Sequence, residues 1–302
     1  MAQYSTGRII SGVGGLYTVR LPDRDIQCRA RGSFRHSKIT PLVGDFVRIG
    51  IDERGDAVID EICERKNSLI RPPLANIDYV FVTMAASSPK PMLDMTDKLC
   101  AILEHNYITP VIVVGKCELD REVATQIKDI YTRAGYSVFI LSCVTGEGID
   151  ELKRFVDNNL SGKLSAFAGA SGVGKSTLLN RLFPTLELGT GEISHKVGRG
   201  KHTTRTVNLF EVCGDGGFLA DTPGFSMLDF DRFDFFKLEN LPNVFPEIHE
   251  CVGMCKYTKC THTKEEGCEV LRKIKCGEMA KSRHESYVEL FGILKSKPRW
   301  SK

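Results

Sequence analysis

At the centre of this 302-residue sequence stands Gly169-Ala170-Ser171-Gly172-Val173-Gly174-Lys175-Ser176, the stretch that decides its fold. The pattern, with Thr177 directly after it, is typical of a phosphate-binding loop. An apolar run at 164–168 precedes the loop, and a helical pattern at 176–183 follows it. In such a strand–loop–helix unit, backbone N–H groups and the positive end of the helix cradle phosphate oxygens. Lys175 is predicted to reach the β- and γ-phosphates, and the Ser176 hydroxyl to bind Mg²⁺.

A second motif lies downstream, where the apolar run 218–220 ends in Asp221 and Thr222-Pro223-Gly224 follows. An aspartate at a strand end beside the phosphates predicts a Mg²⁺ ligand, and the Gly224 N–H is expected to meet the γ-phosphate. The intervening segment 198–205 holds two threonines, of which Thr204 is expected to complete the Mg²⁺ shell. Asp-Thr-Pro-Gly at this distance after a phosphate loop indicates a GTPase rather than a kinase.

The segments that fit guanine recognition come earlier in the chain. Gly115-Lys116-Cys117-Glu118 follows the apolar strand 111–114, and Ser142-Cys143 follows the next strand, 138–141. GTPases usually carry such segments after the phosphate loop, so this order is a circular permutation. Gly115 lacks the usual asparagine amide, and Glu118 has one methylene more than the usual aspartate. Guanine recognition is expected in outline, weakened by about 1–2 kcal/mol for one impaired hydrogen bond.

The rest of the segment from about 75 to 235 alternates between strands and helices. An apolar strand is predicted at 79–84, and helices at 92–106, 123–134 and 149–160. Near-continuous apolar strands that alternate with helices predict a parallel sheet covered on both faces.

The first 70 residues contain short alternating runs, at 16–21, 45–49 and 57–59, separated by Gly, Pro and Asp turns. Runs this short and close together favour a small barrel. Basic side chains crowd one strand and its loop, namely Arg29, Arg31, Arg35, His36 and Lys38. Five-stranded barrels commonly bind oligonucleotides, while the alternative is a charged, solvated loop.

Five of the eleven cysteines lie between positions 251 and 276. Cys255-x4-Cys260-x-His262-x5-Cys268 offers three thiols and one imidazole, the donor set that Zn²⁺ favours in closed structural sites. Cys251 is a fallback ligand, and the alternative is four unrelated residues. The C-terminal part of the segment is expected to be helical, ending with a helix at 286–294.

Charge is unevenly distributed along the chain. Residues 1–48 and 249–302 each carry a net charge of +5, and the middle carries −7. Basic ends suggest contact with a polyanion, the alternative being ordinary solvated surfaces. No apolar run approaches the ~18 residues of a membrane span, and the N-terminus has no apolar signal region. The odd number of cysteines fits a reducing compartment, so a cytoplasmic protein without membrane contact is expected.

A permuted GTPase between an N-terminal barrel and a C-terminal Cys-rich domain resembles the small ribosomal subunit biogenesis GTPase family (ribosome small subunit-dependent GTPase A). The resemblance covers essentially the whole chain. It implies an OB-like RNA-binding barrel at 1–72, an α/β circularly permuted P-loop GTPase domain at 73–234, and a zinc-binding, mainly helical domain with a C-terminal helix at 235–302. It also implies a monomer that binds GTP and GDP with Mg²⁺ and carries one structural Zn²⁺. Its expected partner is the bacterial small (30S) subunit and its 16S rRNA, with late maturation as its role and hydrolysis stimulated by the subunit.

The catalytic group is harder to predict. In many small GTPases a glutamine after the Asp-x-x-Gly motif orients the attacking water, but here Phe225 stands in that place. His202, directly before Thr203, is the best candidate, because a neutral imidazole accepts a hydrogen bond from water near pH 7; the alternative is a solvated residue that contacts rRNA. Two rival functions remain: an RNA-binding assembly scaffold with a vestigial nucleotide site, and an ATPase or nucleoside kinase.

Overall fold

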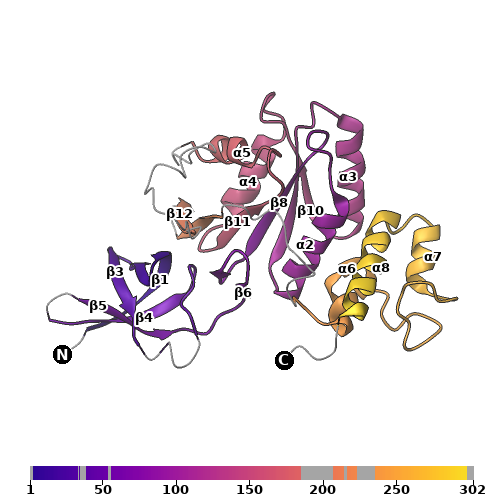
Figure 1. The fold of residues 1–302 in the computed structure, drawn as a ribbon. Coiled ribbons are helices and arrows are strands. Elements are labelled where there is room, and N and C mark those ends of the chain that lie inside the picture. The colour runs from indigo at the N-terminus through magenta and orange to yellow at the C-terminus, as the bar shows by residue number, and fades with distance from the viewer. Residues whose placement is uncertain are drawn as a thin grey trace.

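The computed structural model describes residues 3–32, 34, 39–53, 56–184, 207–213, 216–222 and 235–297. Three parts follow one another along the chain, and Figure 1 shows the central sheet-and-helix part between a small barrel and a helical C-terminal part. No helix within these ranges has both the length and the apolar character that crossing a bilayer requires.

The N-terminal part is the predicted five-stranded barrel. Its strands are β1 (Gln3–Val13), β2 (Leu16–Arg20), β3 (Asp25–Ala30), β4 (Phe46–Ile51) and β5 (Ala57–Ile62). Pairing runs β1-β2-β3-β5-β4, and β4 returns to β1 to close the barrel. Alternate residues point inward, so fully buried side chains fill the interior: Ile9, Val19, Val47, Ile49 and Ile59.

The central part contains the predicted parallel sheet. Five parallel strands lie in the order β10-β9-β8-β11-β13. They are β8 (Tyr79–Ala85), β9 (Thr109–Gly115), β10 (Ser137–Ile140), β11 (Leu164–Ala168) and β13 (Gly217–Asp221). An antiparallel strand that the sequence pattern did not predict, β12 (Asn208–Cys213), pairs with β13.

Helices cover both faces of this sheet, as the alternation of strands and helices predicted. Two apolar cores result, because successive residues of a buried strand point to opposite faces. Val80 and Val82 of β8 belong to the core under α2 (Leu93–His105) and α3 (Arg121–Arg133). Phe81 belongs to the core under α4 (Ile149–Asn159) and α5 (Lys175–Leu182).

The barrel and the central sheet are joined by backbone pairing. Strand β1 pairs with β12 at Ser11 and Asn208, so one eleven-stranded sheet runs through both parts. A short hairpin of β6 (Ser68–Leu69) and β7 (Leu74–Ala75) connects them along the chain, and the predicted division between 72 and 73 falls inside it.

The C-terminal part is helical and packs against α2. It contains the 3₁₀ helix η2 (Leu238–Val244) and the helices α6 (Pro246–His249), α7 (Glu269–Lys275) and α8 (Lys281–Ser296). Helix α8 includes the predicted helix at 286–294 and begins earlier. Its Arg283 is fully buried and binds two carboxylates, Asp97 of α2 at 2.7 Å and Glu247 of α6 at 2.7 Å.

A candidate nucleotide-binding site and a candidate metal centre

The phosphate loop connects β11 to α5, as the sequence predicted. Gly169 has φ +143°, and a Cβ there would lie 2.1 Å from the Thr83 carbonyl oxygen, so only glycine fits. Lys175 begins α5 and curls back over the loop, where its Nζ donates to the carbonyls of Gly169 (2.7 Å) and Ala170 (2.8 Å). Burial lowers the pKa of Lys175, because the charged ammonium loses hydration.

The loop residues divide into an inner and an outer set. Val173 is buried under the loop and fixes it to the core. The outer set consists of three hydroxyl side chains that are exposed to solvent: Ser171, Ser176 and Thr177. Ser176, the predicted Mg²⁺ ligand, therefore lies in the first turn of α5. The N-terminus of this helix favours anions such as phosphate, so ligand and phosphate sites are adjacent.

The first predicted guanine segment lies against the phosphate loop. Gly115 ends β9, and Lys116 adopts the left-handed conformation with φ +57°. Its Nζ donates to the Gly172 carbonyl (2.7 Å) and to the Ser88 carbonyl (2.6 Å). Lys116 therefore joins two segments that lie 56 residues apart in the chain.

The next two residues of this segment face opposite ways. The Cys117 side chain is buried, whereas Glu118 is exposed and available to a ligand. Cys117 Sγ donates to Glu147 Oε2 at 3.7 Å, and Glu147 also forms an ion pair with Arg121. This Arg121–Glu147 pair could not be predicted from the sequence, because no motif connects the two positions.

The second guanine segment is tied to the first. The Cys117 N–H donates to the Leu141 carbonyl at 3.2 Å, directly before the buried Ser142. The Ser142 Oγ accepts from the backbone N–H groups of Val144 (3.2 Å) and Thr145 (3.1 Å), which fixes the turn. Cys143, the other predicted residue here, is partly exposed. The structure thus brings both predicted base segments to one edge of the sheet.

Asp221 lies at the end of β13, next to the strand that enters the phosphate loop. Burial raises the pKa of Asp221, because a desolvated carboxylate is less stable when charged. A divalent cation beside it favours the charged form, so the carboxylate fits the predicted Mg²⁺ site. The predicted residues His202, Thr204 and Gly224 lie outside the described residues.

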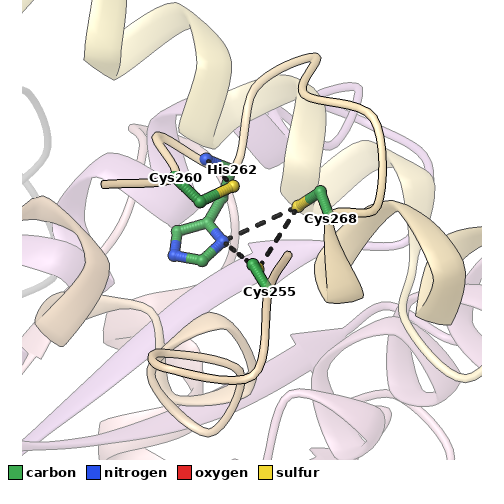
Figure 2. A group of neighbouring side chains, drawn as sticks. All are labelled: Cys255, Cys260, His262 and Cys268. Atoms are coloured by element: carbon green, nitrogen blue, oxygen red, sulfur yellow. Dashed lines mark hydrogen bonds between the residues drawn. The ribbon is translucent and has the colours of Figure 1, made fainter. Parts of the chain in front are cut away.

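The candidate metal centre gathers the four residues that the sequence predicted (Figure 2): Cys255, Cys260, His262 and Cys268. Their donor atoms lie within 4.8 Å of one another. His262 Nδ1 lies 3.5 Å from Cys255 Sγ and 3.7 Å from Cys268 Sγ, and the two sulfurs are 3.9 Å apart. Tetrahedral Zn²⁺, with bonds of about 2.3 Å to sulfur and about 2.0 Å to nitrogen, holds its ligands roughly 3.5–3.8 Å apart. The donor set and its spacing therefore fit Zn²⁺.

Neighbouring groups hold the imidazole ligand in place. Glu265 accepts from the backbone N–H groups of Thr261 (3.0 Å) and Thr263 (3.1 Å) on either side of His262. Despite partial burial, which acts in the opposite direction, the pKa of Glu265 is lowered to about 2 by hydrogen bonds from the Thr261 hydroxyl and from the backbone N–H groups of Thr261 and Lys264. On the other side, His284 Nε2 lies 2.7 Å from the His262 carbonyl oxygen. Neither Glu265 nor His284 could be predicted from the sequence as a support, since such contacts have no characteristic spacing.

The cysteines that remain have ordinary surroundings. Cys251 is buried, and its Sγ donates to the Glu247 carbonyl at 3.5 Å, away from the ligand group. Cys276 is exposed at the end of α7. The described residues therefore assign the fallback ligand Cys251 to packing.

Comparison with known proteins supports the fold and the permuted order. The RsgA GTPase family model matches residues 62–231, and the RsgA N-terminal domain model matches residues 6–59. The chain is 42% identical over 300 residues to the small ribosomal subunit biogenesis GTPase RsgA of Geobacillus thermodenitrificans, covering 97% of this chain and 99% of that protein. It is also 42% identical over 304 residues to the protein of the same name from Enterococcus faecalis, covering 99% of each.

Solved structures agree over nearly the whole chain. YloQ, described as a circularly permuted GTPase, superposes with a TM-score of 0.77 at 35% identity, covering 99% of this chain and 98% of YloQ. YjeQ from Thermotoga maritima superposes with a TM-score of 0.79 at 32% identity, covering 98% of this chain and 100% of YjeQ. With its strand order, its phosphate loop and these matches, the chain is a circularly permuted GTPase that belongs to the RsgA GTPase family.

Proposed function

We propose that this GTPase acts in the late maturation of the small (30S) ribosomal subunit, that it contacts 16S rRNA, and that the subunit stimulates its hydrolysis of GTP. The observation that carries the nucleotide part is the Lys116 contact with Gly172, because it seats the base segment against the phosphate loop. The names of the relatives support the ribosomal part.

Each part of the nucleotide has a proposed partner. Phosphate oxygens meet the loop from Gly169 to Ser176 and the Lys175 ammonium, and Thr177 extends the first turn of α5. Guanine binds to the exposed Glu118 and lies along Lys116, backed by Ser142 and Cys143. The proposed Mg²⁺ ligands are Ser176, Thr204 and Asp221, and the Gly224 N–H meets the γ-phosphate. The bound Mg²⁺ neutralises charge that develops on the phosphate oxygens.

His202 is the proposed group that orients the attacking water. It directly precedes two threonines in the sequence, one of them the proposed Mg²⁺ ligand Thr204. His202→Ala is expected to lose subunit-stimulated turnover by about 100-fold or more, the usual contribution of a positioned acid or base. GTP binding and subunit binding should both persist. If turnover falls only in proportion to lost subunit binding, His202 contacts rRNA instead.

Two basic parts are proposed to hold the rRNA. The barrel continues one edge of the central sheet and the C-terminal part packs against α2, so the two parts can contact separate RNA surfaces (Figure 1). Phosphates attract both parts in a salt-dependent way. We propose one structural Zn²⁺ on Cys255, Cys260, His262 and Cys268, and a monomeric protein in the cytoplasm. The proposed domain division is 1–72, 73–234 and 235–302.

The deciding experiment measures affinities for GTP, GDP and ATP, together with turnover with and without small subunits. We expect a preference for guanine nucleotides and turnover that rises with added subunits. Lys175→Ala should abolish hydrolysis while the thermal melting curve stays unchanged, because among the described residues the hydrogen bonds of this side chain go to two loop carbonyls. A protein that binds subunits but no nucleotide would instead be an assembly scaffold, and a preference for ATP would contradict the assignment of the base site.

A further inference from the structure

The segment 252–259, which contains the candidate metal ligand Cys255, presents large apolar side chains to solvent. Val252, Met254 and Tyr257 keep 49%, 67% and 49% of their surface exposed. Nowhere else in the described part of the chain do three large apolar side chains this exposed lie within six residues. Exposed apolar groups that gather in one place commonly mark a contact surface.

This surface is held in shape by its own backbone. The Lys256 N–H donates to the Gly267 carbonyl at 3.0 Å, and the Cys260 N–H donates to the Tyr257 carbonyl at 3.2 Å. The stem of Lys256 packs over Gly267, where an added Cβ would lie 2.8 Å from Lys256 Cβ. Metal on Cys255 would hold the middle of the segment. The 252–259 segment is therefore pre-formed and loses little conformational entropy on binding.

The charge of the segment indicates what it binds. Residues 251–264 contain three lysines and neither aspartate nor glutamate. Two basic side chains of the neighbouring helix α7 are paired: Arg272 with Glu269 and Glu278, and Lys273 with Glu250. Among the described residues, Lys256 and Lys259 have no carboxylate within ion-pair distance. Unpaired positive charge therefore coincides with the exposed apolar side chains.

We propose that the 252–259 segment binds unpaired bases of single-stranded RNA. One base stacks on the Tyr257 ring beside Met254, and the flanking phosphates meet Lys256 and Lys259. The Lys256 Nζ lies 5.4 Å from the centre of the Tyr257 ring, so ring and charge are placed within reach of one nucleotide. Bases inside a duplex are already stacked, so the surface selects single strands. That the natural source of this RNA is the small subunit rests on the proposed function. The binding of single-stranded RNA itself does not depend on that function.

The test uses the full-length, zinc-loaded protein and labelled oligo(U) and oligo(A) of about ten nucleotides, with an RNA duplex of equal length for comparison. Tyr257→Leu is expected to weaken single-strand binding about 5- to 150-fold, the effect of losing one stacked base, and Tyr257→Phe to stay within about twofold. Duplex binding should not change. The matched control is Tyr107→Leu, which removes a tyrosine that is 85% exposed on the GTPase domain and should have no effect.

A second pair of variants separates stacking from charge. Replacing Lys256 and Lys259 by alanine should reduce the slope of log affinity against log salt by about 1.4, whereas Tyr257→Leu should leave the slope unchanged. Zinc content is measured for every variant, and Met254→Glu, a surface change, repeats the test should Tyr257→Leu lose its metal. Met254→Glu is likewise expected to weaken single-strand binding by at least fivefold.

Two results would overturn the proposal. In the first, Tyr257→Leu and Met254→Glu bind oligonucleotides as tightly as Tyr107→Leu does. In the second, they lose affinity for small subunits but not for oligonucleotides, which would assign the surface to a protein partner. Turnover of the unchanged protein with small subunits is measured separately, so a failure of the proposed function leaves the oligonucleotide result standing.

Discussion

Gly115 begins the first of the two segments proposed to recognise guanine. A Cβ at this position would lie 3.5 Å from the Val173 carbonyl oxygen and 3.7 Å from the Met84 carbonyl oxygen, which are ordinary contacts. A Cβ therefore fits at this position, and the Val173 carbonyl oxygen of the phosphate loop lies close to it. The glycine here is not required by the backbone, in contrast to Gly169.

Gly115→Asn is expected to tighten GTP and GDP binding by about tenfold, the value of one additional hydrogen bond that braces the site. Calorimetric titration with GTP, GDP and ATP measures the change. Gly169→Asn, the matched control, should reduce nucleotide binding and lower the melting temperature, since no side chain fits there. An equal gain for ATP would contradict a brace that acts through the guanine site.

At the residue scale, the sequence predicts residues that belong to a motif. It does not predict contacts between residues that only the strand order brings together. The phosphate loop could be predicted because backbone cradling of phosphate dictates its glycines and its lysine. Glu147 and Arg121 lie 26 residues apart and meet only because β9 and β10 are neighbours. The Lys116 contact with Ser88 depends on the parallel pairing of β8 with β9 in the same way.

At the element scale, the loop that carries the four candidate metal ligands depends on Glu265, a carboxylate that is not one of them. Glu265→Gln removes the negative charge that accepts backbone N–H groups on both sides of His262. We expect zinc affinity to fall about 10- to 100-fold, because supports of this kind orient the ligand. Competition with a chromogenic chelator measures it. Glu266→Gln, a change at the next and exposed position, is the control, and an equal loss in both variants would contradict the orienting role.

Sequence patterns miss elements that are stabilised by strand pairing or by buried polar contacts rather than by a periodic apolar face. Strand β1 contains glycines, serine and arginine, and it is a strand because β2 and β4 pair with it on both sides. Helix α8 begins at Lys281, before the apolar pattern at 286–294, because Arg283 and His284 are buried through polar contacts. From hydrophobic spacing alone, Arg283 and His284 would be predicted to be exposed.

At the scale of the whole molecule, a buried ionic cluster joins the C-terminal part to the GTPase domain. Arg283 lies between Asp97 and Glu247, and its guanidinium stacks 4.7 Å from the centre of the Phe245 ring. Burial in this cluster raises the pKa of Asp97, and the Arg283 charge opposes that rise. Each carboxylate depends on the single arginine for its charge balance.

Arg283→Met leaves both carboxylates buried without their cation and is expected to lower the free energy of unfolding by about 3–5 kcal/mol. Arg272→Met, which breaks solvent-screened ion pairs, should lower the free energy of unfolding far less than Arg283→Met does. Urea unfolding followed by circular dichroism compares the two. Adding Asp97→Asn and Glu247→Gln to Arg283→Met should recover part of the loss, and equal effects of the two single variants would contradict a buried cluster.

The pairing of β1 with β12 has a consequence for aggregation. Strand β12 pairs with β13 on one side and with β1 at Asn208 on the other, so the barrel covers an edge of the central sheet. A chain without residues 1–62 would expose the backbone N–H and C=O groups of that edge, a template for strands of other molecules. We expect such a chain to self-associate with rising concentration, as light scattering would record, while the full chain stays monodisperse. The barrel would then also keep one copy of the protein from pairing, strand to strand, with the next.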